Sequence, residues 1–173
     1  MTHTRANILI PAALILLALV PSLAGIARLA DLATGQPSAA SARFFAAPLP
    51  VVLHILGATL FGMLGALQFA PSLRRRTRWH RIAGRLVVPA GLLAALSGLW
   101  MTLTYPWANA DGVAVYLARL IFGAGMAVSL VLGVTTILRG NITAHRAWML
   151  RGYAIGMAAS TQVFTHLPWF LLV

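Results

Sequence analysis

The stretch Val51–Ala70, VVLHILGATLFGMLGALQFA, decides the fold class of this chain. It contains no charged side chain, and its only polar ones are His54, Thr59 and Gln68. A helix rises 1.5 Å per residue, so about 20 apolar residues cross a hydrocarbon core of roughly 30 Å. The stretch therefore predicts a transmembrane helix.

Four further apolar runs fill most of the remaining sequence, and short gaps between the runs hold nearly every charge. Apolar residues make up 60% of the chain, and the mean hydropathy is +0.87. We therefore expect one all-α transmembrane domain over residues 1–173, a polytopic helix bundle with five spans. The loop before the second span is long enough for a short interfacial helix around Arg43, Phe44 and Phe45. The predicted spans cover about residues 7–30, 51–70, 82–104, 113–138 and 147–173.

The charge pattern predicts the orientation. The formal net charge is +11, and all thirteen cations are Arg. In a soluble protein this charge would suggest nucleic-acid binding, but here most arginines flank apolar spans, as in proteins that follow the positive-inside rule. We therefore expect no nucleic-acid partner, a cytoplasmic N-terminus and an external C-terminus. Ten arginines fall on the predicted cytoplasmic side: Arg5, Arg74, Arg75, Arg76, Arg78, Arg81, Arg85, Arg139, Arg146 and Arg151.

The absence of Cys and the scarcity of acidic residues exclude several kinds of functional site. The chain has no Cys, which removes disulfides, thiolate metal sites and Cys nucleophiles. Asp31 and Asp111 are its only acidic side chains, and both lie in predicted loops. Paired-carboxylate hydrolysis and a proton relay through buried Asp or Glu are therefore excluded. No residue is assigned a catalytic role, and whether the protein is an enzyme stays open.

Four histidines are the candidate cofactor-binding residues, because polar side chains inside a membrane are costly and usually functional. His54 and His166 are predicted near the external face, and His80 and His145 near the cytoplasmic face. Two imidazoles on facing helices can ligate the iron of b-type haem. No other metal is expected, since structural zinc needs four converging ligands. The alternatives are an interhelical hydrogen bond for the external pair and a headgroup contact for the cytoplasmic pair.

Arginines beside the cytoplasmic histidines are candidates for binding an anion or a lipid. Each juxtamembrane cation gains about 1 kcal/mol from an acidic leaflet, and a guanidinium can grip phosphate with two hydrogen bonds. The alternative is a solvated, positive-inside surface. The candidate residues are Arg81, Arg85, Arg146 and Arg151.

The same motifs carry a family resemblance. They are the His54 region ending in Gln68-Phe69, the turn leading into His80-Arg81 and Gly84-Arg85, and His145-Arg146 with Trp148-Met149, Arg151 and Tyr153-Ala154. From Val51 to the C-terminus the chain resembles the family named domain of unknown function 2306. The resemblance implies a multi-pass protein of the bacterial inner membrane and no established activity.

Two functional hypotheses remain. The first is a haem b-binding membrane electron-transfer component, with quinone or a larger membrane complex as partner. The alternative is a non-redox accessory subunit, or a membrane protein that binds an anionic lipid or metabolite.

Overall fold

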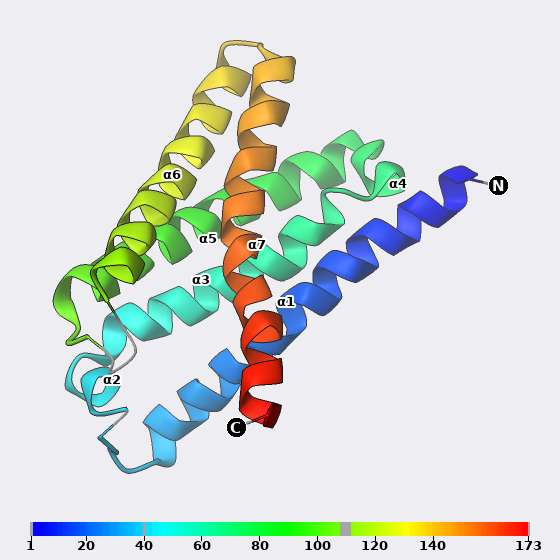
Figure 1. The fold of residues 1–173 in the computed structure, drawn as a ribbon. Coiled ribbons are helices and arrows are strands. Elements are labelled where there is room, and N and C mark those ends of the chain that lie inside the picture. Colours follow the sequence, from blue (N-terminus) through cyan, green and yellow to red (C-terminus); the bar gives the residue numbers. More distant parts are fainter. Residues whose placement is uncertain (1, 40, 108–111, 173) are drawn as a thin grey trace.

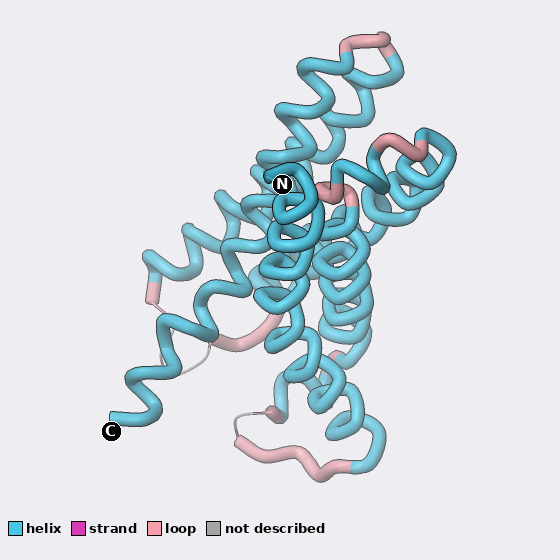
Figure 2. The backbone as a smooth tube through the Cα atoms, turned by 90° about the vertical axis from the view of Figure 1, so that its right-hand side faces the viewer, coloured by secondary structure: helices cyan, strands magenta, loops and turns pink. Residues whose placement is uncertain are grey.

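The structure, a computed structural model, describes residues 2–39, 41–107 and 112–172, with side chains over residues 8–39, 41–107 and 112–161. All regular secondary structure in this part is helical, as Figure 2 shows. This confirms the all-α prediction. The helices are α1 (Thr2–Thr34), α2 (Ala42–Ala46), α3 (Pro48–Leu67), α4 (Pro71–Arg74), α5 (Thr77–Thr104), α6 (Val113–Leu138) and α7 (Ile142–Leu172).

Four of the described helical segments are long and apolar enough to cross a membrane: Ile8–Thr34, Pro48–Leu67, Thr77–Thr104 and Val113–Leu138. They correspond to the first four predicted spans. Helix α7 has 31 residues, but its C-terminal side chains lie outside the described part. The fifth span and the cytoplasmic N-terminus therefore stay predictions.

The long helices form two groups that cross (Figure 1). Helices α1, α3 and α5 run side by side, with α3 in contact with both of the others, and α6 pairs with α7 across them. The N-terminus, α4 and the α6–α7 turn lie toward one end of the bundle, and α2 lies toward the other. We call the first the arginine-rich end, because it carries the arginines of α4, of the first turns of α5 and of the α6–α7 turn.

Small residues allow the helices to approach closely, as is common in membrane bundles. A Cβ added to Gly57 of α3 would lie only 2.8 Å from the Ala90 carbonyl oxygen of α5. At the α6–α7 contact, a Cβ on Gly133 would lie 2.6 Å from the Met149 sulfur. A larger residue at Gly57 would meet the backbone of α5 and push α3 and α5 apart, so this glycine fixes their spacing. A larger residue at Gly133 would have to displace the Met149 side chain.

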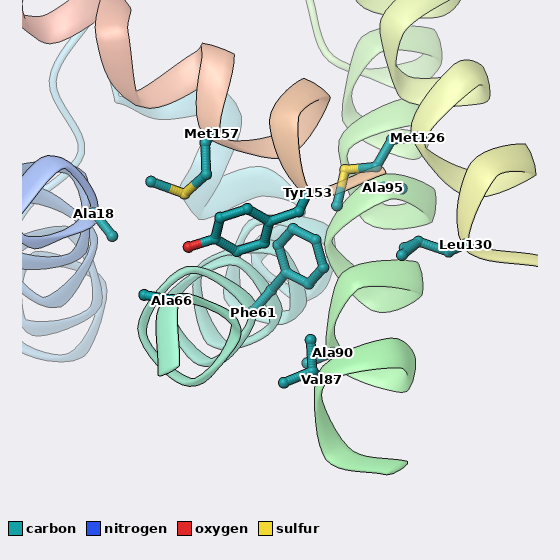
Figure 3. Packing of buried hydrophobic residues seen from close by; sticks show 10 residues of the cluster. All are labelled: Ala18, Phe61, Ala66, Val87, Ala90, Ala95, Met126, Leu130, Tyr153 and Met157. Carbon is teal, nitrogen blue, oxygen red and sulfur yellow. The ribbon is translucent and has the colours of Figure 1, made fainter. Parts of the chain in front are cut away.

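Two aromatic rings form the centre of the core (Figure 3). Phe61 of α3 and Tyr153 of α7 have ring centroids 5.3 Å apart, and their side chains are 3% and 6% exposed. The Tyr153 hydroxyl donates a 2.9 Å hydrogen bond to the Gly62 carbonyl. Because a buried hydroxyl in lipid needs a partner, this bond fixes α7 against α3 and so positions the first turns of α7.

The predicted short helix around Arg43–Phe45 is present as α2. It holds a cluster of charges and rings at the end opposite the arginine-rich one. The Phe44 ring lies 5.0 Å from the Arg28 guanidinium and 4.8 Å from that of Arg43, and it meets the Tyr105 ring edge-on at 5.6 Å. These contacts join the ends of α1 and α5 through α2.

Candidate functional site at the arginine-rich end

Helix α5 opens with three arginines on one face. Arg78, Arg81 and Arg85 follow spacings of three and four residues, which place successive side chains above one another. With Thr77 and Ile82 they line a surface recess of about 310 Å³. The recess therefore combines three guanidinium groups, one hydroxyl and an apolar wall.

No carboxylate neutralises this recess within the described part of the chain. The one acidic side chain there is Asp31, which forms a 2.7 Å ion pair with Arg28 near the other end of α1. An anion that enters the recess thus meets fixed positive charge without displacing an acidic partner. Guanidinium groups match phosphate geometrically, because each can donate two parallel hydrogen bonds.

An exposed apolar stripe continues from the recess along α5. Ile82, Leu86 and Leu96 are 51%, 52% and 57% exposed, and their spacing puts them on the same outward side of the helix as the three arginines. The buried residue Val87 lies on the opposite side, toward the core. A ligand with a charged head and an apolar tail therefore finds both surfaces in line.

The two predicted cytoplasmic histidines both lie at this end. His80 lies in the first turn of α5 and His145 in the first turn of α7, and His80 is within electrostatic range of His145 and of Arg74. The His145 Nδ1–H donates a 2.7 Å hydrogen bond to the Gly133 carbonyl oxygen, which leaves its Nε2 as the lone-pair nitrogen. The Nδ1 atom of His80 is buried without a hydrogen-bond partner.

The predicted external pair has one described member. His54 turns toward α5, where its Nδ1–H donates a 2.9 Å bond to the Ala94 carbonyl oxygen and its ring packs over Gly98. The side chain of His166 lies outside the described residues, so the pairing of the two stays a prediction. Across residues whose side chains are described, no three His, Asp or Glu groups converge on a possible metal position. Axial haem ligation needs only two imidazoles, so this does not test the haem hypothesis.

The four predicted anion-binding arginines occupy different places. Arg81 and Arg85 line the recess on α5. Arg146 is exposed on α7, and the Arg151 guanidinium lies 4.6 Å from the Trp148 ring centroid. The two α7 residues are not part of the recess lining.

Two residues at this end were not among the site residues predicted from the sequence. Arg78 was absent from the candidates, although its three-residue spacing to Arg81 was the available signal. Gln68 was noted only as a polar residue of the second span and as part of the family resemblance, yet both polar atoms of its amide are buried without a hydrogen-bond partner. Unpaired amides cannot be found from sequence, because they depend on what the neighbouring helices supply.

The family model described as "Predicted membrane protein (DUF2306)" matches residues 51–173. No curated protein and no solved structure matches the chain.

Proposed function

Because the chain belongs to the DUF2306 family of predicted membrane proteins, whose description names no activity, we propose a function from the site itself. The protein binds an anionic phospholipid of the bacterial inner membrane at the recess lined by Arg78, Arg81 and Arg85. In this proposal the arginine-rich end faces the cytoplasm, and the protein acts as a non-redox accessory component.

The observation that carries the proposal is the recess of about 310 Å³ with three guanidiniums and no carboxylate partner in the described part. The stripe of Ile82, Leu86 and Leu96 favours a lipid over a free phosphate, since it supplies apolar surface for an acyl chain directly below the charged groups. Thr77 adds a hydroxyl donor for a headgroup oxygen.

The expected affinity gain is modest. At about 1 kcal/mol per arginine, three arginines contribute about 3 kcal/mol, or roughly a hundredfold in affinity for an anionic over a zwitterionic lipid. Lipids surround every membrane protein, and this preference would favour the anionic ones at the recess.

The test is phosphatidylglycerol binding to the purified protein in a neutral detergent, with phosphatidylcholine as the zwitterionic comparison. The triple variant Arg78→Gln, Arg81→Gln and Arg85→Gln should lower phosphatidylglycerol affinity by roughly a hundredfold. The matched control removes the same charge from the preceding turn. That control is Arg74→Gln, Arg75→Gln and Arg76→Gln.

The control triple should change the affinity only a few-fold, because its residues do not line the recess. Equal losses in both triples would show a general surface charge and contradict the site. Inorganic phosphate serves as a competitor: full competition at millimolar concentration would assign the recess to a free phosphate instead of a lipid.

A second candidate is supported by the histidines. We propose that His80 and His145 ligate a b-type haem, which supplies one-electron transfer when bound. Haem-ligating histidines commonly donate the Nδ1–H to a backbone carbonyl and present Nε2 to the iron. His145 has this arrangement with Gly133, and Arg81 and Arg85 on α5 are available to pair with propionates.

The haem candidate is tested by absorption. Protein produced with haem supplied should show a Soret band that shifts on dithionite reduction and is lost in His145→Ala. Retention of the band in His145→Ala with loss in His54→Ala would move the haem to the predicted external pair. A colourless preparation would make the haem candidate wrong and leave the lipid proposal untouched.

A further inference from the structure

The three arginines of the recess lie at different heights along α5. A helix rises about 1.5 Å per residue, so Arg81 lies about 4.5 Å and Arg85 about 10.5 Å beyond Arg78 along the helix axis. Helix α5 is long and apolar enough to cross a membrane, and in a crossing helix this axis runs from the surface toward the lipid core. The positive charge of the recess is therefore a row that leads inward from the surface.

The charge of this row exceeds that of an ordinary phospholipid headgroup. Three guanidiniums line the recess, and no carboxylate in the described part of the chain neutralises them. The phosphodiester of phosphatidylglycerol carries a single negative charge, so it cannot compensate all three. Because hydrogen bonds between guanidinium and phosphate are charge-assisted and strong, a second phosphate in line with the first would gain contacts that the recess already offers.

The size and direction of the recess favour a compact, linear headgroup. Its volume of about 310 Å³ is near the lower end of the range for small-molecule sites, roughly 300–1,000 Å³. The two phosphates of a diphosphatidyl lipid are each anchored by their own acyl chains, so they lie side by side at one depth. The two phosphates of a diphosphate share a bridging oxygen and extend along the direction of the chain. A row of arginines at successive depths matches the second arrangement.

A single apolar stripe leads away from the row. Its exposed side chains are Ile82, Leu86 and Leu96. On the other side of α5, Val87 and Ala90 are buried in the core, so the exposed stripe is one helix face wide. A lipid with one apolar chain covers such a stripe, whereas a diacyl lipid brings two chains.

We propose, on the basis that the recess binds an anionic lipid, that its preferred ligand is an isoprenoid diphosphate, which carries a diphosphate on a single apolar chain. The phosphate bonded to the chain lies between Arg81 and Arg85. The terminal phosphate lies at Arg78, nearer the membrane surface. The chain follows Leu86 and Leu96 toward the lipid core.

The test compares farnesyl diphosphate with farnesyl phosphate, which has the same chain and one phosphate fewer. Binding to the purified full-length protein in a neutral detergent is measured by isothermal titration calorimetry. The wild type should bind the diphosphate about fivefold more tightly, because its terminal phosphate gains Arg78. Arg78→Gln should lower the diphosphate affinity about fivefold and the monophosphate affinity by less than about twofold, so that the preference disappears.

Two further variants check the register of the ligand. Arg85→Gln removes a contact to the phosphate that both ligands share, so it should lower both affinities about fivefold and preserve their ratio. Arg75→Gln is the matched control, because it removes the same charge from the preceding turn and Arg75 does not line the recess. It should change both affinities by less than about twofold.

Equal affinities for the two farnesyl ligands in the wild type would overturn the diphosphate preference. Equal losses of diphosphate affinity in Arg78→Gln and Arg75→Gln would overturn it as well. In either case, loss of phosphatidylglycerol binding in the recess triple variant but not in the control triple would still support the proposed function.

Inorganic pyrophosphate distinguishes a lipid from a soluble diphosphate. It lacks the apolar chain, so it should displace farnesyl diphosphate only at more than about a hundredfold excess. Displacement at equal concentration would overturn the assignment of the recess to a lipid diphosphate.

Discussion

Arginines have different surroundings at the two ends of the bundle. At the end near α2, Arg28 is paired with Asp31 at 2.7 Å, and the guanidiniums of Arg28 and Arg43 lie 5.0 and 4.8 Å from the centroid of the Phe44 ring. Arg43 also donates a 3.2 Å hydrogen bond to the Pro106 carbonyl. At the arginine-rich end, the three recess arginines have no described carboxylate partner. Arg28 and Arg43 thus connect parts of the fold, whereas the recess arginines make no such contact with a carboxylate and are available for the proposed anionic ligand.

The difference has an energetic consequence. Removing a partnered arginine or its ring breaks contacts that the folded state needs, so stability falls. Removing an exposed, unpaired arginine changes folding little, because surface substitutions usually stay within about 0.5 kcal/mol. Stability and ligand affinity should therefore respond to mutations at opposite ends.

The largest expected effect is in a cysteine-labelling experiment that reports which end of the bundle faces the cytoplasm. The natural chain has no Cys, so single cysteines report accessibility without background. Val113→Cys, at the end near α2, should react with an impermeant maleimide added outside intact cells. Thr143→Cys, in the first turn of α7, should react only after permeabilisation. The reverse pattern would show that the positive-inside prediction is wrong.

The next largest effect is the loss of stability when the Phe44 ring is removed. Phe44→Ala removes two cation–π contacts, each worth about 0.5–1 kcal/mol, together with the edge contact to Tyr105. We expect the free energy of unfolding to fall by about 2 kcal/mol, measured by unfolding in mixed detergent micelles. Arg81→Gln should stay within about 0.5 kcal/mol of the wild type. A comparable loss in both variants would remove the contrast between the ends.

The smallest effect is a pH dependence at the end near α2. The Tyr105 hydroxyl donates to the Ala47 carbonyl, and burial raises the pKa of Tyr105 above its ordinary value. The stabilisation is present below the unfolded pKa of about 10, and it declines as the pH rises through the raised folded value, because the unfolded chain loses its proton first. Tyr105→Phe should therefore show a smaller fall in melting temperature between pH 9 and pH 11 than the wild type. Identical slopes would show that Tyr105 is ionised equally in both states.

Much of the fold could be predicted because membrane insertion depends on local hydropathy. The apolar runs predicted the all-α class, and four of the five spans match helices with suitable length and composition. The short helix at Arg43–Phe45 was predicted from the length of its loop, and it is present as α2. Exact bounds were less accurate: α5 begins at Thr77, five residues before the predicted start, because a helix continues past the apolar run when its first turns lie at the membrane surface.

The candidate site was only partly predictable. The His80 and His145 pair was expected because both residues were predicted near the cytoplasmic face, and the structure brings the two within electrostatic range. The partners of His54 could not be read from spacing alone, because its bond to Ala94 depends on the register between α3 and α5.

By itself the sequence determined that this chain forms apolar helices long enough to cross a bilayer, and it predicted that most arginines lie on one side of the membrane. Hydropathy and charge act on each segment separately, so no knowledge of neighbours is needed. Only the tertiary structure decided which arginines have partners and which glycines contact a neighbouring helix. It also decided that the buried amide of Gln68 has no hydrogen-bond partner. Those properties depend on contacts between helices that are far apart in the chain.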